Sequence, residues 1–119
     1  MTTQLRAPSQ TFEATEVISK NLRVKLNAAG TVSIAVGADS DIGVTNGYAY
    51  AAGDDVGVDL ASLEGTAIGV AAVAITTGDK IYGADGGKIG KTNTNAPIGI
   101  AMSDAAADGD KVEFVRRQI

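Results

Sequence analysis

The sequence predicts a small all-β domain, a barrel or sandwich assembled from short hairpin-like units. The first observation behind this prediction is a phrase that occurs three times, as Ile42-Gly43-Val44, Ile68-Gly69-Val70 and Ile98-Gly99-Ile100. Each copy is followed by Gly-Asp and an apolar residue, with the glycines at positions 53, 78 and 109. An interval this short, bounded by glycines, suits one strand, a turn and the start of the next strand.

The second observation is that apolar and polar residues alternate over short runs, and the third is the supply of fifteen glycines for the turns between them. A chain of 119 residues suits one domain. We expect that domain over residues 21–119, preceded by an N-terminal arm over residues 1–20. The arm is predicted because residues 1–16 contain Pro8 and many polar residues and have no sustained periodicity.

The first strands of the domain are expected in residues 22–36. Alternation over residues 22–26 places three aliphatic side chains on one face and Arg23 and Lys25 on the other. Residues 27–30 carry a turn signal, and the alternation resumes at Val32, so the segment reads as a hairpin. Asn46-Gly47 predicts a type I′ hairpin turn, because this pair readily adopts the positive φ angles that such a turn needs.

The later elements follow the same pattern of short runs and turns. Residues 67–75 are apolar on both faces, which favours a buried central strand. Pro97 suits the start of a strand, because proline has no N–H to donate inside a sheet. The remaining expectations are a strand at 56–60, a loop or helical turn at 59–65, a tight hairpin of 81–83 with 88–90, a strand at 98–102, a loop or short helical turn at 103–109 and a last strand at 112–115.

The composition argues against catalysis. The sequence contains no cysteine, histidine or tryptophan, so the usual general base, the strongest nucleophile and the common zinc ligands are missing. We therefore expect no enzyme activity and no cofactor or metal. Hydrophobic residues make up 45% of the chain but aromatic residues only 4%, so the core is rich in small side chains. Such a core gives modest stability to a monomer, which oligomerisation or docking on a larger body would raise.

Charge and hydropathy bear on the partners. Residues 1–27 carry four basic and two acidic side chains, a net charge of +2, while residues 28–119 carry six and twelve, a net charge of −6. An acidic body disfavours nucleic acid as a partner, and the basic front end suits either an acidic protein surface or simply solvent. The sequence has no signal-peptide pattern and no apolar run long enough for a membrane, so a soluble protein made in a cytoplasm is expected.

The glycine and aspartate motifs are interpreted as turn chemistry. Glycine takes a positive φ and aspartate accepts a nearby backbone N–H, which closes a turn and starts a strand. No glycine cluster matches a phosphate-binding loop, and no acidic cluster has the spacing of a calcium-binding loop. Tyr48, Tyr50 and Tyr82 suit core or interface packing better than a ligand platform.

Phrases over the second half of the chain resemble the capsid cement, or decoration, proteins of tailed bacteriophages. The phrases are GTAIGV at 65–70, ITTGDKIY at 75–82, ADGGKI at 84–89, PIGIA at 97–101 and GDKVEF at 109–114. The resemblance is weak before Asp41. It implies a β-tulip-like barrel without enzyme activity, present as a homotrimer on the outer surface of the virion. It further implies synthesis in the host bacterial cytoplasm and binding to the major capsid protein of an expanded head.

Within that interpretation, we expect residues 4–12 of the arm to order on docking, chiefly through Leu5, Arg6, Pro8 and Phe12. Two alternatives remain open. The first is a lipoyl- or biotinyl-like carrier or small-ligand-binding barrel, for which Gly87-Lys88-Ile89 is the nearest approach to a modified-lysine hairpin. The second is a hydrolase that uses two carboxylates, which would need two acids converging in a pocket.

Overall fold

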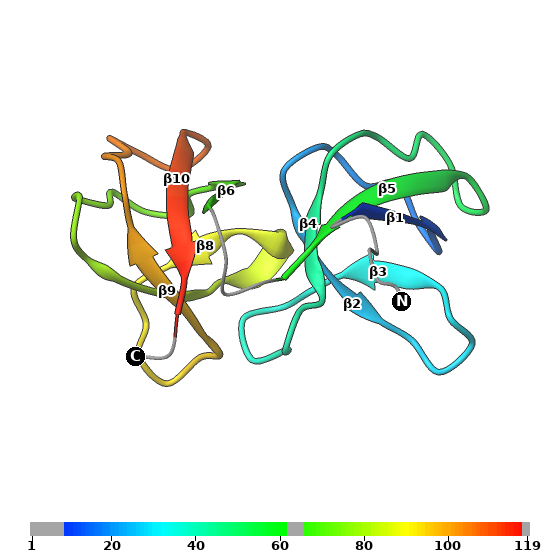
Figure 1. The fold of residues 1–119 in the computed structure, drawn as a ribbon, viewed down its shortest axis with the longest axis horizontal. Coiled ribbons are helices and arrows are strands. Elements are labelled where there is room, and N and C mark those ends of the chain that lie inside the picture. Colours follow the sequence, from blue (N-terminus) through cyan, green and yellow to red (C-terminus); the bar gives the residue numbers. More distant parts are fainter. Residues whose placement is uncertain (1–8, 62–65, 118–119) are drawn as a thin grey trace, which may run out of the picture.

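A computed structural model of the chain describes residues 9–61 and 66–117 and confirms the all-β prediction. The strands form two antiparallel five-stranded sheets that lie side by side along the long axis of the molecule (Figure 1). Neither sheet closes into a barrel, because each retains two edge strands. In the described residues the only helical element is the short 3₁₀ turn η1 (Asp85–Gly87).

The first sheet has the order β1-β5-β4-β2-β3. The bounds of its strands are β1 Ser9–Glu13, β2 Arg23–Leu26, β3 Val32–Ile34, β4 Gly43–Thr45 and β5 Asp55–Leu60. The second sheet has the order β6-β10-β9-β7-β8. The bounds of its strands are β6 Thr66–Val70, β7 Lys80–Gly83, β8 Ile89–Gly90, β9 Pro97–Ala101 and β10 Lys111–Arg116.

The two sheets have the same topology. In each, the first strand pairs with the last, and the other strands follow in the same order. Isolated bridges outside the strands repeat as well: Ala14–Val32 corresponds to Ala71–Ile89, and Ile18–Ala49 corresponds to Ile75–Ala105. We call residues 9–61 the first unit and residues 66–117 the second unit. The chain is therefore a tandem duplication of a five-stranded unit.

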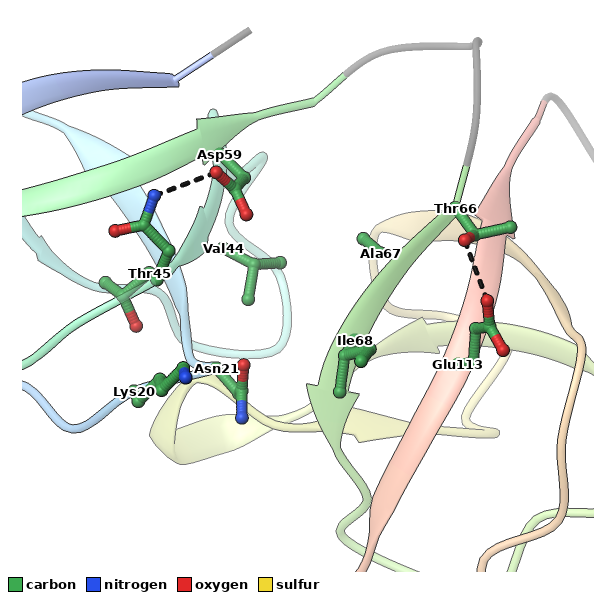
Figure 2. Close-up of a pocket in the computed structure, with 10 residues that line it drawn as sticks. Lys20, Asn21, Val44, Thr45, Asp59, Thr66, Ala67, Ile68 and Glu113 are labelled. Atoms are coloured by element: carbon green, nitrogen blue, oxygen red, sulfur yellow. Dashed lines mark hydrogen bonds between the residues drawn. The ribbon is translucent and has the colours of Figure 1, made fainter.

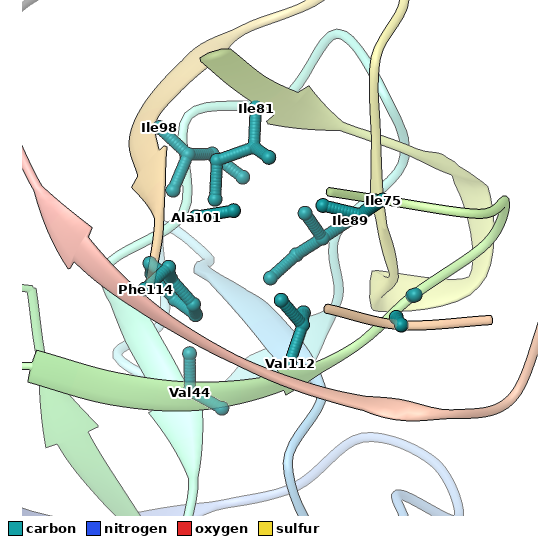
Figure 3. Close-up of a cluster of buried hydrophobic side chains, with 10 residues drawn as sticks. Val44, Ile75, Ile81, Ile89, Ile98, Ala101, Val112 and Phe114 are labelled. Carbon is teal, nitrogen blue, oxygen red and sulfur yellow. The ribbon is translucent and has the colours of Figure 1, made fainter. Parts of the chain in front are cut away.

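The two hydrophobic cores show the duplication residue by residue. Seven buried residues of the first core occupy the positions of seven in the second, and each pair is aliphatic or aromatic on both sides. Figure 3 shows the second core. The pairs are Ala14 and Ala71, Ile18 and Ile75, Val24 and Ile81, Val32 and Ile89, Ala49 and Ala105, Val56 and Val112, and Val58 and Phe114. Val44 of β4 joins the second core, so the two units pack against each other.

The repeated Ile-Gly phrase marks the same strand in both units, and a close approach of the backbone explains its glycine. A Cβ atom at Gly43 would lie 2.1 Å from the carbonyl oxygen of Asp59, and one at Gly99 would lie 1.9 Å from that of Val115. At Gly69 the nearest atom is instead the side-chain Cδ1 of Ile89, at 2.4 Å. The middle phrase lies in the edge strand β6, so the three copies of the phrase do not mark three equivalent units.

The Gly-Asp turns form as predicted. Gly53, Gly78 and Gly109 all have positive φ angles, between 93° and 96°. The following carboxylates accept backbone N–H groups: Asp54 from Tyr50 and Ala51, Asp79 from Thr76, and Asp110 from Ala106 and Ala107. The hairpins predicted at 22–36 and 81–90 are present as β2-β3 and β7-β8.

Other local predictions differ from the structure. Asn46-Gly47 does not close a two-residue hairpin, because β4 and β5 are joined by the longer segment 46–54 and Asn46 bonds Asp59 through its side chain. The apolar run at 67–75 is the edge strand β6 followed by a bend, and Ile68 is half exposed. Part of the predicted arm belongs to the first unit, since Ser9–Glu13 pairs with β5 and Ala14 and Ile18 are fully buried.

Candidate interaction surfaces

Backbone hydrogen bonds hold the two units together at one junction. The N–H of Gly87 donates to the carbonyl of Ala35 at 2.9 Å, and the N–H of Ala96 donates to that of Gly37 at 3.1 Å. The N–H of Gly37 donates to the carboxylate of Asp85 at 2.9 Å. These bonds join the segment after β3 to the turns that flank β8, so the units form one continuous body.

Arg23 lies fully buried at this junction. One terminal nitrogen of its guanidinium donates to the carbonyls of Ala84 and Lys88 in the second unit, at 3.4 and 3.5 Å. The other donates to the carbonyls of Val36 and Asp39 in the first unit, at 3.3 and 3.2 Å. Burial lowers the pKa of Arg23, and the neighbouring Asp41 carboxylate opposes that shift. Alternation places Arg23 on the polar face of its strand but does not reveal this burial, which arises because the second unit covers that face of the hairpin.

Asp41 links the two units electrostatically. Its carboxylate lies 3.7 Å from Nε of Arg23 and accepts two hydrogen bonds from the guanidinium of Arg116 in β10. The side chain of Asp41 is 5% exposed and that of Arg116 is 11% exposed. One carboxylate thus serves two arginines, one from each unit, away from solvent. The group is structural, since its hydrogen bonds go to its own members and to backbone carbonyls, while the buried Nε of Arg23 contributes only its charge.

A groove of about 360 Å³ opens between the two units on the side of β4 and β6 (Figure 2). Several of its polar side chains already have partners. Asp59 accepts from Asn46 at 2.9 Å and from Ser9 at 2.6 Å, and Thr66 donates to Glu113 at 2.8 Å. The apolar part of the lining comes from Val44, Ala67 and Ile68. The two acids of the lining, Asp59 of β5 and Glu113 of β10, come from different units, and each already accepts a hydrogen bond from a neighbouring side chain.

Acidic side chains elsewhere serve turns. The pKa of Asp39, Asp79 and Asp104 lies below its usual value, chiefly because the backbone N–H groups of Val36, Thr76 and Thr77, respectively, stabilise the charged form. Within residues 9–61 and 66–117, no group of acidic side chains is arranged to hold a metal ion. Lys88, the nearest approach to a carrier lysine, forms an ion pair with Asp108 at 2.7 Å.

The exposed surface includes an aromatic pair. Tyr48 and Tyr50 stack with ring centroids 5.8 Å apart and an angle of 15° between the ring planes. They are 51% and 77% exposed, so neither belongs to the core. The other large apolar side chains with considerable exposure are Val17, Leu26, Val36, Ile68, Val73 and Met102. Local sequence patterns mark the tyrosines as interface candidates but do not show their stacking.

The residues predicted for the arm fall in two places. Phe12 is in β1 and packs against the first core. Leu5, Arg6 and Pro8 lie outside the described residues. No helix in the described part of the chain is long and apolar enough to cross a bilayer.

Comparisons with protein families and with solved structures both find proteins similar to this chain. A family model described as phage cement protein matches residues 7–118. The solved structure of the head fiber gp8.5 N base of bacteriophage phi29 matches with a TM-score of 0.75 over 92% of each chain. Its sequence is 18% identical, so this second match shows a shared fold. No curated protein matches the chain.

Proposed function

Because the chain belongs to the phage cement protein family, we propose that it binds the outer surface of an expanded phage head and reinforces contacts between major capsid subunits. A structural role in the phage head, as a component of the virion, follows from that membership. The docking site, the partner subunit and the number of copies per assembly are the parts that we propose.

The observation that carries the proposal is the family match over residues 7–118, which spans both units. The architecture supports it. The junction at Arg23 and Asp41 makes the two units one body, and such a body can span neighbouring subunits without hinging. Many copies that each contact more than one subunit stabilise a shell, even where each contact is weak.

We further propose that residues 4–12 contribute to docking, with Leu5, Arg6 and Pro8 as contacts and Phe12 anchoring the segment in the first core. Ser9 fixes the start of this anchor, because its hydroxyl donates to Asp59 at 2.6 Å. Addition of an extended segment to an exposed sheet edge is a common mode of peptide recognition. We also propose that three copies assemble as a homotrimer, which light scattering tests as a mass three times that of one chain.

The test is cosedimentation with expanded empty heads, using unexpanded heads as the control. The full chain is expected to sediment with expanded heads. Deletion of residues 1–8 is expected to weaken binding by at least about tenfold, equivalent to roughly 1.4 kcal/mol per site. A longer deletion that reaches residue 14 is unsuitable, because it removes β1 and the buried Ala14.

The matched control is the double variant Thr2→Ala, Thr3→Ala, which changes the same terminal segment outside residues 4–12. It is expected to bind as the unmodified chain does. If the full chain does not sediment with expanded heads, the proposed function is wrong. If the shortened chain binds as well as the full chain, only the docking role of residues 4–12 is wrong.

A further inference from the structure

The stacked Tyr48–Tyr50 pair carries an inference that rests on the proposed function and adds a docking surface to it. Tyrosines supply large contact areas with little loss of conformational entropy, and they are enriched at the centres of protein interfaces. Here two of them expose stacked rings next to each other. Exposed aromatic surface of this kind points to a partner.

The duplication provides an internal comparison for this pair. The bridge Ile18–Ala49 in the first unit corresponds to Ile75–Ala105 in the second. By that correspondence, Tyr48 and Tyr50 occupy the positions of Asp104 and Ala106, and Val17 occupies that of Ala74. The second unit therefore forms the same bridge and the same turn without aromatic side chains. Folding of the unit does not require the tyrosines, so their presence in the first unit alone calls for another cause.

The second unit also shows what this position does when it serves the fold. Asp104 accepts hydrogen bonds from the N–H and the hydroxyl of Thr77, at 2.7 and 2.8 Å, and so ties the segment between β9 and β10 to the turn before β7. Tyr48 instead directs its ring outward against that of Tyr50. The segment that carries both tyrosines, between β4 and β5, reaches the end of the first unit that lies away from the second (Figure 1). A partner can approach there without disturbing the junction.

The net charge of the segments around the two tyrosines indicates what kind of partner fits this surface. The two segments joined by the Ile18–Ala49 bridge, residues 13–20 and 48–55, carry four acids and one base, a net charge of −3. A second copy of this chain would bring like charges together at such a contact, which disfavours self-association through it. A basic and apolar surface is complementary, because arginine and lysine bind the faces of aromatic rings and attract acidic rims.

We propose that the surface formed by Val17, Tyr48 and Tyr50 docks a basic, apolar segment of the capsid shell protein. The rings supply the buried area, and a cationic side chain of the shell protein stacks on an exposed ring face. Acidic groups of the two flanking segments attract that cation, so the contact weakens as salt is added.

The experiment compares the double variant Tyr48→Ala, Tyr50→Ala with the unmodified chain in cosedimentation with expanded heads. We expect binding to weaken by at least about tenfold, as is common for aromatic hot spots. The conservative variant Tyr48→Phe, Tyr50→Phe keeps the rings and is expected to retain most of the binding. The control is Val73→Ala, Met102→Ala, which removes exposed apolar side chains from the second unit and is expected to bind normally.

A second measurement does not depend on the folding of a variant. Nitration of tyrosines in the unmodified chain is expected to fall at Tyr48 and Tyr50 when heads are present, with Tyr82 of the second unit as the internal reference. Equal nitration with and without heads, or normal binding by the double alanine variant, overturns the docking surface while the proposed function stands. A fall in oligomer mass on substitution overturns it too, because the surface would then join copies of this chain. Failure of the unmodified chain to bind heads overturns the proposed function itself.

Discussion

At the scale of single residues, the fold depends on glycines that serve two separate purposes. Those of the Gly-Asp turns provide positive φ angles, while Gly43 and Gly99 let a neighbouring backbone carbonyl approach. The close approach at Gly43 and Gly99 cannot be recognised from the residue patterns that mark turns. It explains why Ile-Gly followed by an aliphatic residue recurs at equivalent strands of the two units.

Substitution of Gly99 by alanine tests the close approach. A methyl group there would overlap the carbonyl oxygen of Val115, a backbone atom that cannot rotate away. We expect Gly99→Ala to lower the free energy of unfolding by about 1–3 kcal/mol or more, measured by urea denaturation. Gly47→Ala is the control, because no atom lies within 4 Å of the added methyl group. Equal stability of the two variants would contradict the packing argument.

At the scale of elements, turn carboxylates predict how stability depends on pH. Asp39, Asp79 and Asp104 have a lowered pKa in the folded protein because backbone N–H groups bond their charged forms. A lowered folded-state pKa gives stability that is present above the unfolded-state pKa and is lost as pH falls through the folded-state value. We expect the urea midpoint to drop below about pH 4, the ordinary range of aspartate.

The variant Asp79→Asn separates this effect from general acid sensitivity. It removes the carboxylate that accepts from Thr76, so it is expected to be less stable than the unmodified chain at neutral pH and to lose less on acidification. Urea midpoints recorded from neutral to acidic pH compare the two proteins. A difference between them that stays constant over the whole range would exclude the turn carboxylate as a source of the pH dependence.

The strands also show which parts of the fold local sequence patterns can predict. Hairpins β2-β3 and β7-β8 were predictable because their partners are neighbours along the chain and alternation marks both strands. The pairing of β1 with β5, and of β6 with β10, joins strands far apart in the sequence, so no local pattern reveals it. Ser9–Glu13 was assigned to an arm for that reason. The prediction of a central strand at 67–75 is wrong, because apolar residues on both faces do not distinguish a central strand from an edge strand followed by a bend.

At the scale of the whole molecule, the junction between the two units explains why Arg23 is buried. Alternation along one hairpin places Arg23 on its polar face but cannot show what covers that face. In the structure that face of the hairpin is covered by the second unit, and Asp41 and Arg116 complete a buried ionic group. Contacts between segments far apart in the sequence, such as this ionic group, are recognised only in the folded structure.

Asp41→Asn tests whether this group holds the molecule together. The change leaves the buried guanidinium of Arg23 without its carboxylate, and the expected loss in the free energy of unfolding is about 3–5 kcal/mol. Asp108→Asn is the matched control, because Asp108 pairs with Lys88 at the surface and its side chain is 62% exposed. Its expected loss is about 1 kcal/mol or less. Urea denaturation measures both, and similar losses would show that the junction does not depend on Asp41.

The duplication has a consequence for how the molecule behaves at high dilution. Had the two units been separate polypeptides, dilution would separate them, because their association would depend on their concentration. Joined in one chain, they meet at a local concentration that dilution does not change. The contact built around Asp41 therefore survives in surroundings where a two-chain version of the same body would fall apart.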